Sequence, residues 1–128
     1  MNKSAATVAL MGVALVIGCN EQRKATYDTA ASAAKDGAFD RGWLPDVLLP
    51  DASDISEDHD LDSNRGEARF QPTAQLEVRV KQQCSRLPRE EAPPGPFHLQ
   101  SQPGIDQYKC GEFMLALDMG HKRGYMWH

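Results

Sequence analysis

The N-terminal segment MNKSAATVALMGVALVIG limits how much of the chain can enter a folded domain. Its single positive charge, at Lys3, precedes an uncharged and mostly apolar run from Ala5 to Gly18. This is the plan of a secretory signal peptide, which is removed from the mature protein. The run is short for a transmembrane helix, which needs about 20 apolar residues. We therefore exclude residues 1–18 from the fold and expect an exported protein.

The signal segment runs into Val16, Ile17, Gly18 and Cys19. These residues resemble the box of bacterial lipoproteins, in which small residues precede a cysteine that becomes the acylated first residue. The resemblance implies a diacylglycerol thioether on Cys19. Two or three acyl chains, such as palmitate, hold a protein stably on a membrane, whereas one chain binds only marginally. The alternative is an ordinary signal peptide whose cleavage site happens to lie near a cysteine.

The next residues, CNEQRKA at 19–25, are polar and show no periodic apolar pattern. We predict a tether that reaches at most about 25 Å when fully extended, so the domain stays near the membrane. Asn20, where an aspartate would favour the inner membrane, favours the outer membrane by enteric sorting rules. The expected location is the cell envelope, with the lipid anchor on the periplasmic side.

Lipidation of Cys19 leaves two cysteines, Cys84 and Cys110, in a chain exported to a compartment where disulfides persist. We predict a disulfide between them, and a loop of this length contributes about 3 kcal/mol by restricting the unfolded chain. Two reduced, buried cysteines are the alternative.

The composition is that of an ordinary globular protein, with 41% hydrophobic and 25% charged residues. The 128-residue chain is long enough for one small core, so we predict a single domain over residues 26–128. Seven acidic residues and no Lys or Arg lie between residues 44 and 64, whereas residues 65–128 carry nine basic and seven acidic side chains. Because no long basic run exists, we do not expect a nucleic-acid partner.

The first half of the expected domain alternates between helical and irregular patterns. The Ala-rich stretch at 26–38 favours a helix, and Gly37 is placed to stop it. The following stretch has the glycine and prolines of an irregular loop among large apolar residues, which we expect to be buried. We also expect a loop in the acidic stretch at 54–64, followed by a strand at 66–71 in which Ala68 and Phe70 face the core. The apolar residues expected to pin the first loop are Phe39, Trp43, Leu44, Val47 and Leu48.

The second half predicts a helix, a long loop and a hairpin. Pro72 suits the first turn of a helix to about Arg86, whose buried face includes Cys84. Five prolines make residues 88–107 irregular. We expect one strand from about residue 107 with a bulge at Gly111, a turn at 119–123 and a last strand at 124–127. The fold class is α+β: a helix and the Trp/Pro loop packed on a small antiparallel sheet with a second helix.

The segment RGWLPDVLLPDASDISEDHDLDSN, at 41–64, carries the most specific pattern in the chain. It resembles a group of small, mostly uncharacterised bacterial lipoproteins and membrane-associated proteins that share G-W-[LI]-P, then L-P, a small residue, an Ile and H-[DN]-[LI]-D-[ST]-N before a strand. The resemblance implies a shared module and no particular reaction. The matching positions are Gly42, Trp43, Leu44, Pro45, Leu49, Pro50, Ala52, Ile55, His59, Asp60, Leu61, Asp62, Ser63 and Asn64.

The alternating oxygen ligands in DHDLDSN suggest a calcium loop, but the spacing excludes an EF-hand. Counted from Asp60, the required glycine at position 6 is Arg65 and the required glutamate at position 12 is Gln71. Short polar side chains such as those of Asp62 and Asn64 bond to nearby backbone amides and form turns. We therefore interpret the motif as a structural corner, in which His59 bonds a neighbouring carboxylate or packs with Trp43. A non-EF cation site and a partner-binding surface are the alternatives.

The sequence offers no catalytic constellation, so we assign no catalytic residue, cofactor or metal ligand. It has no G-x-S-x-G elbow, its cysteines lack C-x-x-C spacing and its four histidines are scattered. The leading hypothesis is a non-enzymatic envelope lipoprotein, bound to the membrane through its lipid, that acts as a structural or protein-interaction module for an unknown envelope protein or ligand. The alternative is a small ligand- or metal-binding protein, or an enzyme, that uses the acidic 54–64 loop.

Overall fold

The computed structural model describes residues 22–92, 95–97, 99 and 102–128. These residues form a seven-stranded sheet in the order β1-β2-β3-β7-β6-β5-β4, and every neighbouring pair is antiparallel. The segments expected to hold the signal peptide and the lipidated Cys19 lie outside the described residues. The strands are β1 (Gln22–Thr29), β2 (Ser53–Asp60), β3 (Arg65–Gln71), β4 (Ser85–Leu87), β5 (Asp106–Cys110), β6 (Phe113–Asp118) and β7 (Arg123–Trp127).

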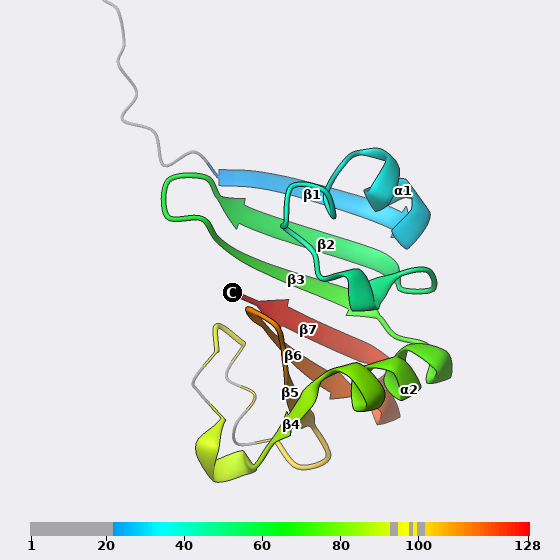
Figure 1. Cartoon of the computed structure of the whole chain (residues 1–128), viewed down its shortest axis with the longest axis vertical. Helices are drawn as coiled ribbons and strands as arrows, with labels where there is room; N and C mark the ends of the chain where they lie inside the picture. Colours follow the sequence, from blue (N-terminus) through cyan, green and yellow to red (C-terminus); the bar gives the residue numbers. More distant parts are fainter. Residues whose placement is uncertain (1–21, 93–94, 98, 100–101) are drawn as a thin grey trace, which may run out of the picture.

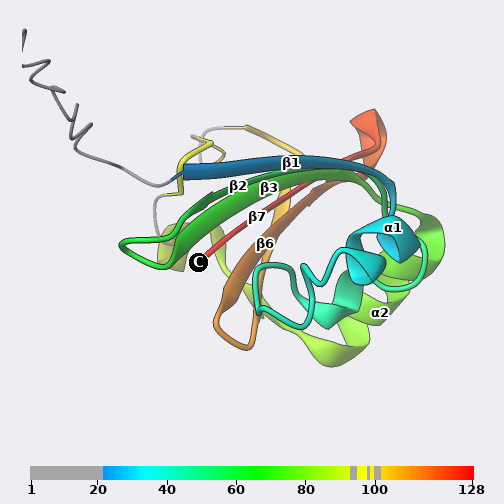
Figure 2. The ribbon, with the colours of Figure 1, turned by 90° about the horizontal axis from the view of Figure 1, so that it is seen from above.

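Two α-helices, α1 (Ala30–Lys35) and α2 (Ala74–Gln83), occur in the described chain, and both lie on the same face of the twisted sheet (Figures 1 and 2). We call this the helical face. The segment around Phe97 lies on the opposite face, where it packs with Tyr125 and Trp127. Three short 3₁₀ turns are also described: η1 (Asp46–Leu48), η2 (Arg89–Glu91) and η4 (Met119–His121). No helix in the described ranges has the length and apolar character that crossing a bilayer would need.

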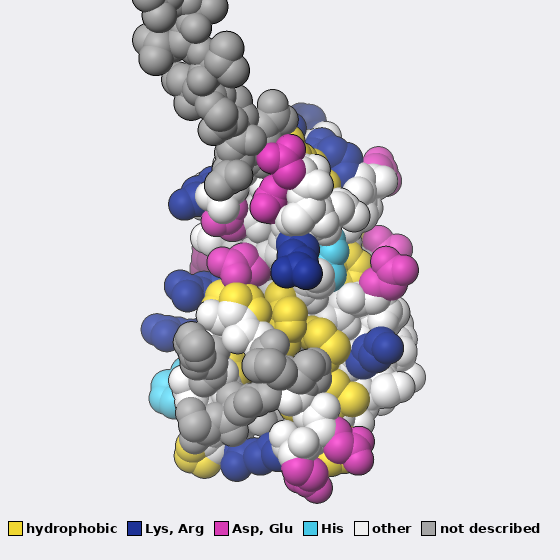
Figure 3. Space-filling model, turned by 90° about the vertical axis from the view of Figure 1, so that its left-hand side faces the viewer, with side chains coloured by type: hydrophobic (Ala, Val, Ile, Leu, Met, Phe, Trp, Pro, Cys, Tyr) yellow, Lys and Arg dark blue, Asp and Glu magenta, His cyan; other side chains and the backbone are white. Residues whose placement is uncertain are grey.

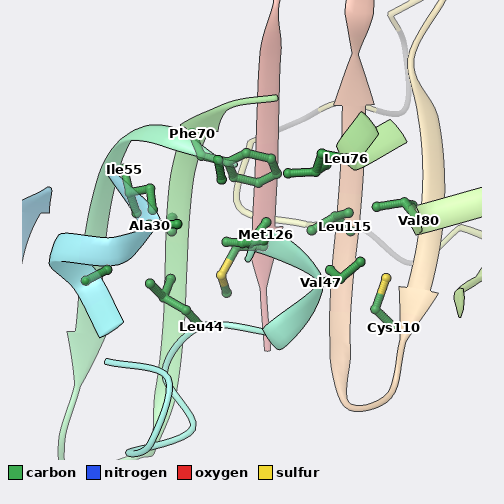
Figure 4. Close-up of a cluster of buried hydrophobic side chains, with 14 of the residues drawn as sticks. Ala30, Leu44, Val47, Ile55, Phe70, Leu76, Val80, Cys110, Leu115 and Met126 are labelled. Carbon is green, nitrogen blue, oxygen red and sulfur yellow. The ribbon is translucent and has the colours of Figure 1, made fainter. Parts of the chain in front are cut away.

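The main core fills the space between the helical face and the two helices (Figure 4). The Trp/Pro loop contributes to it as expected: Leu44 and Leu48 are fully buried and Trp43 nearly so. Leu76 and Val80 of α2 are also buried, and the disulfide between Cys84 and Cys110 joins the end of α2 to β5. The predicted disulfide pairing, the buried loop and the buried face of the second helix are therefore features of the fold.

The prediction of a helix at 26–38 was wrong in its first half. Residues 22–29 form β1, which pairs along its length with β2, and the helix covers only Ala30–Lys35. Hydrogen bonds to a neighbouring strand outweigh the weak helix preference of the alanines, and Thr29 caps the helix by accepting a bond from the Ser32 N–H at 3.1 Å. Residues 22–25, which we expected in the tether, belong to this strand.

The acidic loop expected at 54–64 was also wrong, because residues 53–60 form β2, the second strand of the sheet. The sequence of β2 shows no alternation of apolar and polar residues, because its buried side carries Glu57 and His59 as well as Ile55. Gly111, expected as a bulge, instead lies with a positive φ of 63° in the tight turn between β5 and β6. The second helix ends at Gln83 and gives way to β4. At the coarse level α+β describes the molecule, but the sheet dominates it and is larger than expected.

Candidate functional site

The motif residues meet at the end of the sheet near the β2–β3 turn. His59 is 1% exposed and points to the helical face from β2. Its ring stacks on Trp43, with ring centres 4.6 Å apart and planes inclined by 21°. Its Nε2 atom lies 3.2 Å from the Asn64 side-chain oxygen. Both a ring contact and a hydrogen bond therefore fix this imidazole, and the first of them is the packing with Trp43 that the sequence suggested.

His59 belongs to a row of neighbouring residues that crosses the sheet from β1 through β2, β3 and the end of β7 to β6. Arg23 and Gly66 are its direct partners on β1 and β3, and Gly66 exchanges two backbone hydrogen bonds with His128. The His128 ring lies 5.5 Å from the His59 ring and 4.9 Å from the ring of Phe113 on β6. We call Arg23, His59, Gly66, His128 and Phe113 the imidazole row.

Gly66 lets the two histidines approach each other. A Cβ atom at this position would lie 2.7 Å from His59 Nδ1 and 2.9 Å from His128 Nε2. Both nitrogens are buried and have no hydrogen-bond partner among the described residues. Burial lowers the pKa of His128, and the neighbouring His59 lowers it further. The row is thus a packed contact of aromatic and imidazole rings between strands, with two buried nitrogens that have no partner among the described residues.

The β2–β3 turn is closed by the acids of the motif. One Asp60 side-chain oxygen accepts hydrogen bonds from the backbone N–H groups of Asp62, at 2.9 Å, and Ser63, at 3.3 Å. These bonds lower the pKa of Asp60, because they stabilise the ionised carboxylate. Asn64 has a positive φ of 54°, which asparagine tolerates better than most residues. The turn geometry agrees with the structural corner expected from the sequence.

Trp43 is the centre of a second set of contacts. The Arg41 guanidinium lies 4.1 Å from its ring centre and that of Arg23 lies 5.4 Å away, which are cation–π distances. Arg41 also donates to the backbone oxygen of Asp36 at 2.7 Å. The Trp/Pro loop is therefore clamped onto β1 and β2 through one indole ring. Pro45, the other predicted site residue of this loop, is buried and directly precedes η1.

Glu57 is the one buried acid of the described chain, at 4% exposure, and its two carboxylate oxygens have no hydrogen-bond partner there. It lies two residues before His59 on β2 and points to the same helical face. Burial raises the pKa of the Glu57 carboxyl, although the charges of Arg41 and Arg23 act in the opposite direction. Nothing in the sequence distinguished Glu57 from the other acids between residues 44 and 64, so it was not predicted as a site residue.

The predicted site residues thus divide into two groups. Trp43, His59, Asp60 and Asn64 come together around the turn, whereas Asp62 is exposed at the turn and contributes its backbone N–H. Sequence reasoning missed the other members of the imidazole row, and the one available signal was Gly66, two residues after the end of the motif. Among the described residues, no three His, Cys, Asp or Glu side chains are grouped as a metal ion requires.

Two open grooves lie on the sheet, one near this end and the other at the opposite end of the strands. One, of about 560 Å³, is lined by Gln22, Asp60, Arg65, Pro96, Trp127 and His128 among others. Another, of about 480 Å³, lies on the opposite face beside the cations Arg69, Lys122 and Arg123 and the rings of Phe97 and Tyr125. Figure 3 views this end of the molecule, where hydrophobic side chains are exposed below a group of acidic and basic ones. These are surfaces suited to binding rather than enclosed cavities.

Comparison with known proteins gives one match, to the family of the YbbD head domain over residues 21–71. The matched stretch holds β1, α1, the Trp/Pro loop, β2 and β3, and therefore all the motif residues. It covers less than half of the chain. No curated protein and no solved structure matches the sequence.

Proposed function

We propose that this protein is a lipid-anchored component of the bacterial cell envelope whose domain binds another envelope component without catalysis. The observation that supports this proposal best is that the motif residues make structural contacts within the fold. His59 is held between Trp43 and Asn64, and the Asp60 carboxylate caps the turn. These groups stabilise one end of the sheet, and the 560 Å³ groove beside it remains open as the binding surface.

The anchor in this proposal is a diacylglycerol thioether on Cys19, on the periplasmic side and more specifically on the outer membrane. Its support is the box at residues 16–19, together with the distance along the chain to β1. Only two residues lie between Cys19 and Gln22, and three residue steps span about 10 Å at most. Gln22 lines the 560 Å³ groove. The anchored domain would therefore hold this groove close to the membrane surface.

Metabolic labelling with a fatty-acid probe tests the anchor. We expect the wild type to be labelled and to stay in the membrane fraction, and the Cys19→Ala variant to lose both properties. An unlabelled wild type that behaves like Cys19→Ala would refute lipidation.

The binding role is tested by site-specific photocrosslinking in intact cells. A crosslinker at Glu67, which lines the 560 Å³ groove, should give a discrete adduct. The matched control carries the same crosslinker at Val78, which is 53% exposed on α2. Identical adduct patterns at the two positions, or none at Glu67, would reject this groove as the binding surface.

A further inference from the structure

The first strand, β1, forms one edge of the sheet. It pairs with β2 on one side and, among the described residues, with no strand on the other. Figure 2 looks down onto this edge and shows it uncovered along its length, while α1 lies over the helical face at its C-terminal end. The strand has eight residues, which is longer than the average strand. An open edge of this length is a template for pairing with another strand.

The side chains of β1 alternate strictly between the two faces of the sheet. Arg23, Ala25 and Tyr27 lie on the helical face, opposite His59, Glu57 and Ile55 of β2. Lys24, Thr26 and Asp28 lie on the other face. In two antiparallel edge strands related by a two-fold axis, each residue faces one on the same side of the sheet. Such a pair must therefore be centred on one residue.

The charged residues of β1 favour one residue as the centre of the pair. With Thr26 facing Thr26 of a second copy, Lys24 of each chain lies directly opposite Asp28 of the other, which gives two pairs of opposite charge. A centre at Ala25 would instead place Lys24 opposite Thr26. The order QRKATYDT is thus complementary to itself about Thr26.

We propose that the outer edge of β1 binds β1 of a second copy of this chain, antiparallel and centred on Thr26, to form one continuous sheet. An edge lysine normally prevents such pairing, because an incoming strand would bury its charge without a partner. Here the second copy supplies the carboxylate of Asp28. Lys24 is not firmly held elsewhere: it is 74% exposed and lies 3.9 Å from the nearest Asp58 oxygen. The inference concerns the edge of the domain and does not depend on acylation of Cys19.

A single cysteine at the centre of the pair tests this arrangement in the full-length chain, in isolated membranes. Directly opposite residues lie close enough for a disulfide, and the native Cys84 and Cys110 are already bonded to each other. The unmodified chain, oxidised in parallel, shows any dimer that Cys19 forms, and this amount is subtracted. Mild oxidation of Thr26→Cys should convert most of the chain to a dimer on a non-reducing gel. Val78→Cys, equally free to react on the exposed side of α2, should remain a monomer. Equal dimer formation by the two variants, or none by Thr26→Cys, would overturn the proposal.

Charge reversal tests the register separately. In the Thr26→Cys background, Lys24→Asp places two carboxylates opposite each other and should strongly reduce dimer formation. Adding Asp28→Lys restores opposite charges in reversed order and should restore the dimer. Both positions are exposed, but Lys24→Asp also places a carboxylate opposite Asp58 of the same chain, so the urea unfolding curve of each variant checks that the folded state is preserved. Failure of the double reversal to rescue the dimer in a folded protein would reject the Thr26-centred register.

Discussion

Replacing Gly66 by alanine tests whether the imidazole row stabilises the fold. The new methyl group would lie 2.7 Å from His59 Nδ1 and 2.9 Å from His128 Nε2, closer than real Cβ atoms come to such neighbours. His59 has little room to move away, whereas His128 is partly exposed and lines the 560 Å³ groove. The other side of His59 is covered by Trp43, whose ring centre is 4.6 Å away, and His128 lies against Phe113 at 4.9 Å.

The expected cost combines two opposing effects. Forcing an additional methyl group into a packed site costs about 1–3 kcal/mol. Alanine regains about 0.5–1 kcal/mol, because glycine in a strand loses more backbone entropy on folding. The two ranges combine to about 0–2.5 kcal/mol. Because the new Cβ would lie within 3.0 Å of two rings, we expect Gly66→Ala to lower the free energy of unfolding by about 1–2 kcal/mol, in the upper part of that range.

Urea unfolding followed by tryptophan fluorescence measures this difference, and the slope of the transition should remain that of the wild type. Gly120→Ala is the matched control, because the nearest atom to its new Cβ is an Asp118 oxygen at 3.7 Å, an ordinary contact. A double-mutant cycle with His128→Ala makes the test specific, since removing this imidazole relieves the 2.9 Å contact and should recover part of the cost, while the 2.7 Å contact with His59 remains. A change below about 0.5 kcal/mol, within the range of neutral substitutions, would refute the reasoning. So would a full cost that persists in the His128→Ala background.

Three other predictions address the rest of the fold. Replacing Cys84 and Cys110 by serine should lower the free energy of unfolding by about 3–4 kcal/mol, measured with urea, because a 26-residue separation is no longer closed. Hydrogen bonding by Arg79 lowers the pKa of Asp51, so the stability that this pair contributes is present above about pH 4 and is lost as the pH falls through the lowered pKa. Asp51→Asn should therefore be less stable than the wild type at pH 7, and the two proteins should converge near pH 2 in thermal melts. Burial raises the pKa of Tyr27 to about 12, so the stability that its neutral form contributes is present below pH 10 and is lost as the pH approaches 12. Because Tyr27 does not ionise between pH 9 and 11, Tyr27→Phe should leave the tyrosinate absorbance gained over this range unchanged.

The sequence predicted the elements in which hydrophobic spacing follows burial. The strand with Ala68 and Phe70 and the helix with Leu76 and Val80 lie where their periodicity placed them, because their buried sides are apolar. It failed at β1, where short and polar residues carry little pattern and the strand exists through its pairing with β2. Such pairing joins residues that are about 30 positions apart, and local propensity contains no information about it.

The sequence predicted the parts of the candidate site that depend on contacts between residues close together in the chain. The Asp60 turn is formed within four residues, and short polar side chains are typical of such turns. The packing of His59 against Trp43 was one of two options left open, and the structure selects it. His128 was missed because it enters the row through β7, whose place beside β3 was not visible in the sequence. No spacing rule links two residues that meet only through the order of strands.

The concentration of acids in β2 becomes intelligible once its neighbours are known. β2 lies between β1 and β3, which bring basic side chains to it: Lys24 is the direct partner of Asp58, and Arg65 is the direct partner of Asp60. Opposite charges at facing positions stabilise a strand pair, and a shift by two residues in one direction would leave Lys24 opposite the uncharged Ser56. The acids therefore help to fix the register of three strands whose exposed face carries little apolar surface. A stretch that reads as a solvated acidic loop in one dimension is, in the sheet, a strand whose Asp58 and Asp60 face Lys24 and Arg65, although Asp58 also lies opposite Glu67.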